Sequence, residues 1–88
     1  MTDHRRVTDF VVHYSTPEMN GENWSQIKDD WNQNALDAWL KVARQRGLNV
    51  TVRELTDSHY IVAIVEVDGH EYALRHLGRR MELQAEPR

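Results

Sequence analysis

The sequence of 88 residues contains no cysteine. This absence excludes disulfide bridges, thiolate metal sites, iron–sulfur clusters and cysteine nucleophiles. No stretch approaches the roughly 20 consecutive apolar residues of a membrane-spanning helix. The opening residues, MTDHRRVTDF, lack the apolar core of a signal peptide. The sequence therefore predicts a soluble, cytoplasmic protein with no membrane contact.

Glycine and proline are also scarce, with four and two residues. The glycines are isolated, so the sequence has no glycine-rich phosphate-binding loop. The histidines lack metal-binding spacing, and His70 and His76 on one strand would lie about 20 Å apart. No serine stands in a nucleophile motif. We therefore expect no catalytic residue, no metal site and no cofactor, and a protein that is not an enzyme.

The residues that are present predict one long helix. Apolar residues recur three and four positions apart from Trp24 to Val42, which is the spacing of one helix face. Asn23 is a suitable N-cap, and Gly47 suits the left-handed position that follows a helix. This pattern predicts a helix over 24–46.

Four segments have the composition of β-strands, and two pairs of turn residues separate the last three. The expected strands cover 7–14, 49–55, 60–67 and 70–77. Their order around the helix predicts an α+β, two-layer sandwich in which one helix packs on a three- to four-stranded, mostly antiparallel sheet. A right-handed crossover would set the first strand parallel to its neighbour.

The chain length fits a single domain over 1–88. Polar residues dominate both ends, so we expect loose termini at 1–6 and 79–88. A short strand over 81–83 is the alternative for the second of these segments.

Two-residue hairpin loops fix which residues of neighbouring strands lie opposite each other. Without bulges, the Asp68-Gly69 loop pairs Val67 with His70, Val65 with Tyr72, Ala63 with Leu74 and Ile61 with His76. The Asp57-Ser58 loop pairs Val52 with Ala63 and Val50 with Val65. The face that the helix covers would then contain Val50, Val52, Ile61, Ala63, Val65, Val67, Tyr72 and Leu74.

The opposite sheet face would carry an apolar patch flanked by arginines. Its residues are Arg53, Leu55, Tyr60, Val62, Ile64, Ala73, Arg75 and Leu77. Exposed apolar patches on small proteins mark contact sites. Three occupants fit this patch: a second copy of the chain in a homodimer, a different protein partner, or the chain's own tail.

Charge is unevenly distributed in a chain of net charge −3. Acidic residues gather around the first half of the expected helix, where they complement its dipole. They also form a candidate acidic contact face, which consists of Glu22, Asp29, Asp30 and Asp37. These features favour a non-catalytic interaction protein that binds a protein partner. Size and composition resemble those of phage and mobile-element accessory inhibitors, anti-CRISPR proteins among them, and this is an analogy without a motif.

Two other function classes stay open. A small nucleic-acid-binding domain would use the open sheet face with Arg53 and Arg75, although the negative net charge disfavours this class. The order of one helix and three strands resembles the double-stranded RNA-binding domain, but residues 78–88 lack the lysines that this family carries on a final helix. A dimeric small enzyme or ligand-binding protein would place its site at the dimer seam.

Overall fold

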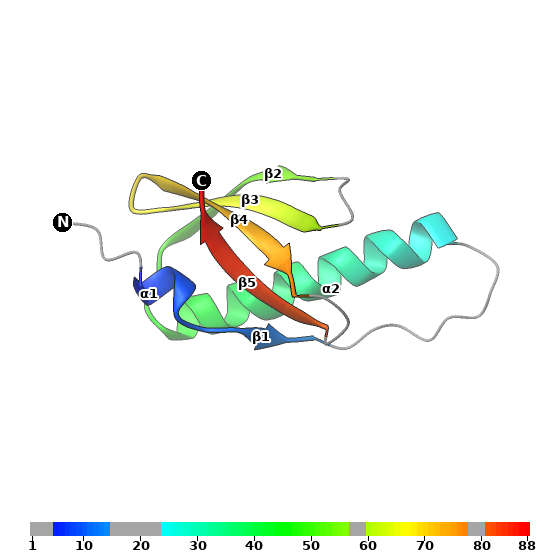
Figure 1. Cartoon of the computed structure of the whole chain (residues 1–88), viewed down its shortest axis with the longest axis horizontal. Helices are drawn as coiled ribbons and strands as arrows, with labels where there is room; N and C mark the ends of the chain where they lie inside the picture. The colour runs from blue at the N-terminus through cyan, green and yellow to red at the C-terminus, as the bar shows by residue number, and fades with distance from the viewer. Residues whose placement is uncertain (1–4, 15–23, 57–59, 78–80) are drawn as a thin grey trace.

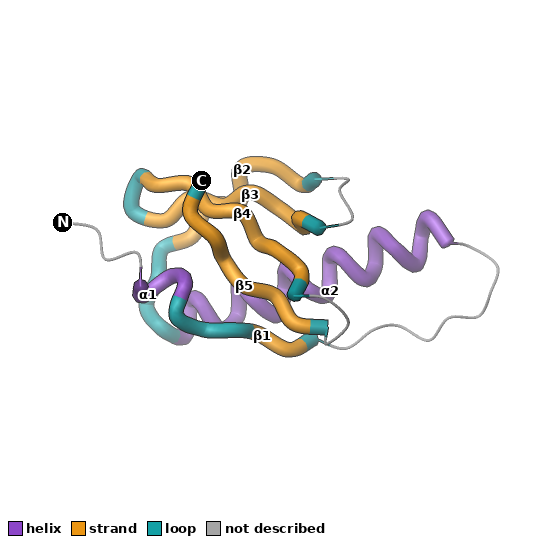
Figure 2. The backbone as a smooth tube through the Cα atoms, in the orientation of Figure 1, coloured by secondary structure: helices purple, strands orange, loops and turns teal. Residues whose placement is uncertain are grey.

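The computed structural model describes residues 5–14, 24–56, 60–77 and 81–88. The elements are α1 (Arg5–Thr8), β1 (Val12–His13), α2 (Trp24–Gln45), β2 (Val50–Leu55), β3 (Ile61–Val67), β4 (His70–His76) and β5 (Glu82–Pro87). The described strands form one antiparallel sheet in the order β1-β5-β4-β3-β2 (Figure 1). The long helix α2 packs on one face of this sheet (Figure 2). The predicted α+β sandwich is confirmed, with five strands in place of three or four.

Helix α2 covers the predicted range to within one residue at its end. Gly47 has φ of 79°, a left-handed conformation that only glycine adopts without steric cost. The Leu48 N–H donates to the Ala43 carbonyl (3.0 Å), and the Gly47 N–H donates to the Arg44 carbonyl (3.0 Å). These bonds satisfy carbonyl groups of the last helical turn and direct the chain into β2.

The hairpin of β3 and β4 forms around the predicted two-residue turn. Asp68 and Gly69 both have positive φ, 52° and 81°, as this type of turn requires. Beyond the turn, Val67 pairs with His70, Val65 with Tyr72 and Ala63 with Leu74. The predicted register is therefore confirmed over this part of the hairpin.

The structure differs from the prediction in two segments, residues 5–14 and residues 82–87. The expected strand over 7–14 is wrong for most of its length, because residues 5–8 form α1 and only 12–13 form β1. The loose tail expected over 79–88 is wrong for 82–87, which form β5. Because β5 lies between β4 and β1, β1 is antiparallel to its neighbour, and the predicted parallel pairing is also wrong.

The register of β3 with both of its neighbours differs from the prediction, and each pair contains a bulge. In the β2–β3 pair, Val50 lies opposite Val67 and Val52 opposite Val65, so the predicted partners of both residues are wrong. The register shifts between Val52 and Glu54. In the β3–β4 pair it shifts between Ile61 and Ala63, and Ile61 lies opposite Arg75 instead of His76. An extra residue at each bulge reverses the alternation of faces beyond it.

The core lies between α2 and the covered face of the sheet. Among its fully buried side chains are Trp39, Val65, Val67, Tyr72, Leu74 and Leu83. Phe10 stacks on Trp39 with ring centroids 5.7 Å apart, and the Arg46 guanidinium lies 4.4 Å above the Phe10 ring. The segment that follows α1 therefore seals the core beside β1.

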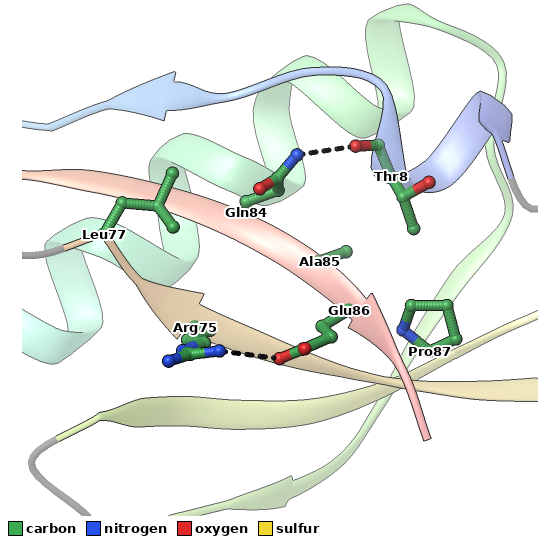
Figure 3. Close-up of a pocket in the computed structure, with 7 residues that line it drawn as sticks. All are labelled: Thr8, Arg75, Leu77, Gln84, Ala85, Glu86 and Pro87. Atoms are coloured by element: carbon green, nitrogen blue, oxygen red, sulfur yellow. Dashed lines mark hydrogen bonds and ion pairs between the residues drawn. The ribbon is translucent and has the colours of Figure 1, made fainter.

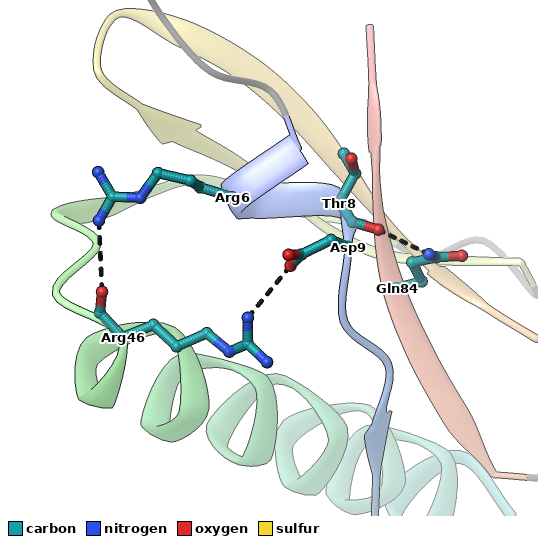
Figure 4. A network of polar contacts seen from close by, with 5 residues as sticks. All are labelled: Arg6, Thr8, Asp9, Arg46 and Gln84. Carbon is teal, nitrogen blue, oxygen red and sulfur yellow. Dashed lines mark hydrogen bonds and ion pairs between the residues drawn. The ribbon is translucent and has the colours of Figure 1, made fainter.

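Polar contacts hold α1 and the segment after it against the C-terminal end of α2 (Figure 4). Arg46 Nη1 forms an ion pair with Asp9 Oδ1 at 3.1 Å, and Arg6 Nη2 donates to the Arg46 carbonyl at 3.4 Å. A cation beside the last carbonyls of a helix also complements the helix dipole. Gln84 Nε2 donates to the Thr8 carbonyl (2.7 Å), which connects α1 to β5.

Candidate functional site

The structure does not bring the eight predicted patch residues together on one surface. Val62 is the extra residue of the β3 bulge and belongs to the core, with 2% of its surface exposed. Leu55 lies opposite Ala63 and therefore shares the side of the sheet that faces α2. Tyr60, just before β3, is 70% exposed, and Leu77, just after β4, is half-buried.

The sheet face away from α2, here called the outer face, is charged. Its small apolar centre consists of Ile64 and Ala73, which are only 5% and 8% exposed. Three ion pairs lie on the same face: Arg53–Glu66 (3.8 Å), Arg75–Glu86 (3.4 Å) and Arg88–Glu71 (3.1 Å). His13 Nε2 also lies 3.7 Å from Glu82 Oε2. The predicted apolar patch is therefore wrong, and the homodimer expected through this face loses the surface that suggested it.

A hollow of about 310 Å³ lies above β4 and β5 (Figure 3). Its polar groups already have partners, because Arg75 pairs with Glu86 and Gln84 donates to the Thr8 carbonyl. Leu77, Ala85 and Pro87 complete its lining. Each charged group named here as lining the hollow already has a partner, so none of them is left to bind an incoming ligand.

The exposed apolar residues on the α2 side lie at the β2 edge of the sheet. Val52 is 37% exposed and Leu55 is 63% exposed, although both lie opposite core residues of β3. The strand β2 has one neighbour among the described strands, so its second side forms the open edge of the sheet (Figure 1). We define the open edge as this side of β2 together with the side chains of Val52 and Leu55.

A groove of about 300 Å³ separates α2 from the end of β2 and the start of β3. Its lining residues are Asn32, Gln33 and Leu36 from α2, with Leu55, Thr56 and Val62. Leu36 and Val62 are core residues that the groove reaches. The Thr56 hydroxyl donates to the Ile61 carbonyl. The groove thus combines an apolar floor with amide groups on its α2 wall.

A chain of polar contacts begins at the Asn32 wall of the groove. Asn32 Oδ1 lies 3.3 Å from His76 Nε2, and His76 Nδ1 lies 2.7 Å from the Tyr14 hydroxyl. Because an amide oxygen only accepts, Nε2 carries the proton, and Nδ1 of the neutral ring accepts from Tyr14. Burial lowers the pKa of His76 and raises the pKa of Tyr14, because both charged forms lose hydration. These contacts, made by the neutral forms of Tyr14 and His76, therefore connect the end of β1 with β4 and α2.

The predicted acidic contact face is only partly described. Asp37 is exposed on α2 and accepts a hydrogen bond from Gln33 Nε2 at 2.9 Å, so it flanks the groove. Asp29 and Asp30 occupy the preceding turns of α2, and their side chains lie outside the described residues. Glu22 also lies outside the described residues.

Sequence reasoning missed the groove, the open edge and the contacts of His76. The exposed position of Leu55 follows from the bulge in β2, which no turn residue signals. Strand alternation alone puts Val52 and Leu55, three positions apart, on different faces, and no residue between them signals the bulge that brings them to the same face.

Comparisons with known proteins give no function. No protein-family model, no curated protein and no solved structure matches the chain. Within the described residues, neither helix combines the length and the apolar character needed to cross a bilayer. The same residues contain no group of three or more histidine or acidic side chains placed to hold a metal ion.

Proposed function

We propose that the protein is a non-catalytic interaction protein whose groove binds an apolar side chain on a basic surface of a protein partner. The observation that carries this proposal is the groove itself, in which core residues Leu36 and Val62 are reached from outside beside an exposed leucine. Apolar pockets of this kind accept the anchoring side chains of protein partners.

Charge supports a basic partner. Asp37 stands beside the groove on an exposed helix face, and the two preceding acids of α2 outnumber Lys28 in that region. Complementary charge raises association rates and makes binding sensitive to salt. The expectation that the partner is an enzyme targeted by a phage or mobile-element inhibitor stays a prediction.

The nucleic-acid alternative receives less support from the described surface. Arg53 and Arg75 each pair with a glutamate on the outer face. A stacking platform for single strands combines free cations with exposed aromatic rings. The carboxylates on this face would repel phosphate groups.

A matched pair of substitutions in α2 tests the proposed function. Gln33 and Gln45 are both exposed, and Gln33 lines the groove whereas Gln45 ends the helix. We expect Gln33→Trp to fill the groove and weaken partner binding by about tenfold or more, and Gln45→Trp to leave it unchanged. The measurement is quantitative capture of partners from cells of the source organism by wild type and both variants.

Two acidic residues of α2, Asp30 and Asp37, are tested with the same assay. Asp30→Asn/Asp37→Asn should weaken binding and flatten its dependence on salt. Capture that survives Gln33→Trp undiminished would remove the groove from the function, and the absence of any specifically bound protein would contradict the proposal as a whole.

A further inference from the structure

We infer that the open edge pairs with the open edge of a second copy of this chain, in an antiparallel, two-fold arrangement. The inference does not depend on the proposed function. It rests on the bulge of β2, which decides on which face of the sheet each side chain of residues 52–55 lies.

The bulge groups these four side chains by chemistry. Val52 and Leu55 share the α2 side, because they lie opposite the core residues Val65 and Ala63. Glu54 lies on the outer face opposite Ile64, and Arg53 reaches Glu66 on the same face. The sequence from 52 to 55 therefore presents two apolar groups on one face and two opposite charges on the other.

This arrangement is complementary to itself. In an antiparallel pair, directly opposite residues lie on the same face of the sheet. A two-fold axis between Arg53 and Glu54 sets Val52 opposite Leu55 of the second copy and Arg53 opposite Glu54 of the second copy. Each dimer then has two apolar pairs on the α2 side and two ion pairs on the outer face, with no like charges opposite each other.

Backbone groups at the open edge suit this pairing. The Thr56 N–H donates to the Val62 carbonyl at 3.1 Å, toward β3. Because neighbouring residues of an antiparallel strand alternate in direction, the N–H and C=O of Leu55 point away from β3. The bulge adds one residue to this alternation, so the N–H and C=O of Val52, before the bulge, also point away from β3. Val52 of one copy and Leu55 of the other can therefore exchange backbone hydrogen bonds.

Pairing also changes the groove. Leu55 lies on the rim of the groove, and the second copy brings its Val52 next to this rim. Each groove thereby gains an apolar wall from the other chain. The seam is short, and small interfaces bind weakly, so we expect a dimer with a dissociation constant in the range of about 10 µM to 1 mM.

Sedimentation of the full chain over this concentration range tests the inference. Val52 and Val11 provide a matched control, because they are 37% and 38% exposed and lie toward opposite edges of the sheet. We expect a concentration-dependent dimer for wild type and for Val11→Glu, and a folded monomer for Val52→Glu. Circular dichroism establishes that each variant is folded.

Reversing the charge of Arg53 or of Glu54 gives the sharper test, because both side chains are exposed and the changes leave the core intact. Arg53→Glu and Glu54→Arg each place like charges opposite each other and should raise the dissociation constant by about tenfold or more. A mixture of these two variants restores both ion pairs and should form a heterodimer.

Three results would overturn the inference. They are a wild type that stays monomeric at about 1 mM, a dimer that Val52→Glu and Val11→Glu affect equally, and a mixture of the charge-reversed variants that pairs no better than either variant alone. None of these results bears on the capture of a protein partner through the groove, so the two proposals fail separately.

Discussion

At one edge of the sheet, β1 contributes two residues, and the core beside it is covered by Phe10 and Asp9 of the segment after α1, with Arg46 from the end of α2. At the other edge, β2 contributes six residues, and every position from Thr51 to Leu55 is exposed. Both edges carry apolar residues, but among the described residues only the first edge has a cover for them. The comparison indicates that stability is concentrated at the β1 edge, whereas β2 is available for contacts with other molecules.

The largest expected effect is a difference in the free energy of unfolding between a substitution at the β1 edge and one at the β2 edge. Phe10 is 6% exposed and stacks on the buried Trp39, whereas Leu55 is 63% exposed. We expect Phe10→Ala to lower the free energy of unfolding by about 3 kcal/mol, through lost burial and the cavity left behind. Leu55→Ala should change it by less than about 0.5 kcal/mol, as is usual at exposed positions. Urea denaturation of both variants at low protein concentration measures this difference.

Equal losses in these two variants would contradict the comparison. A large loss for Leu55→Ala at high protein concentration alone would instead reveal a contribution from self-association, because dimer stability depends on concentration.

An intermediate effect should come from the chain of Tyr14, His76 and Asn32, which holds β1 and β4 to α2. Tyr14→Phe removes the hydrogen bond to His76 Nδ1 and should cost about 1 kcal/mol. Burial lowers the pKa of His76 in the folded state, so the unfolded chain binds its proton first as the pH falls. Stability from this group is therefore complete above the unfolded pKa of about 6.5 and decreases as the pH falls from there through the lower folded pKa.

His76→Gln provides the control for the pH dependence. Unfolding free energies are measured for wild type and His76→Gln at several values between pH 8 and about pH 5, above the range in which most carboxylates titrate. The wild type should lose more stability than the variant across this interval. Parallel curves would show that His76 does not titrate differently in the folded and unfolded chains.

The sequence predicted those parts of the fold that local patterns determine. The helix ending before Gly47 follows from its apolar periodicity and its C-terminal glycine. The Asp68-Gly69 turn set the register of the β3–β4 hairpin as far as Ala63. In both cases the residues that decide the conformation are adjacent in the sequence, so one chain segment contains the whole signal.

The missed features depend on contacts between distant segments. Leu83 and Ala85 alternate with polar residues as a strand requires, but 82–87 becomes a strand only because β4 and β1 pair with it on either side. The bulges at Arg53 and Val62 have no local signature, and they decide that Val62 enters the core and Leu55 leaves the outer face. The candidate site could not be predicted for this reason, since the groove and the open edge exist only after both register shifts.

The smallest expected difference compares one arginine at each edge. Arg46 is tied to Asp9 at 3.1 Å and lies over the Phe10 ring, whereas Arg53 reaches Glu66 at 3.8 Å on the outer face. Exposed ion pairs contribute between about 0 and 1 kcal/mol, and a cation over an aromatic ring adds a similar amount. We expect Arg46→Gln to cost about 1 kcal/mol and Arg53→Gln at most about 0.3 kcal/mol in the monomer, measured by urea denaturation at low protein concentration.

High salt sharpens this last comparison. Screening weakens exposed ion pairs, so the difference between Arg53→Gln and wild type should vanish in about 1 M salt. Most of the Arg46 effect should persist, because contact between its side chain and the Phe10 ring also excludes water from Trp39. If both effects vanished with salt, Arg46 would act only as a surface charge, and the closure of the β1 edge would rest on Phe10 alone.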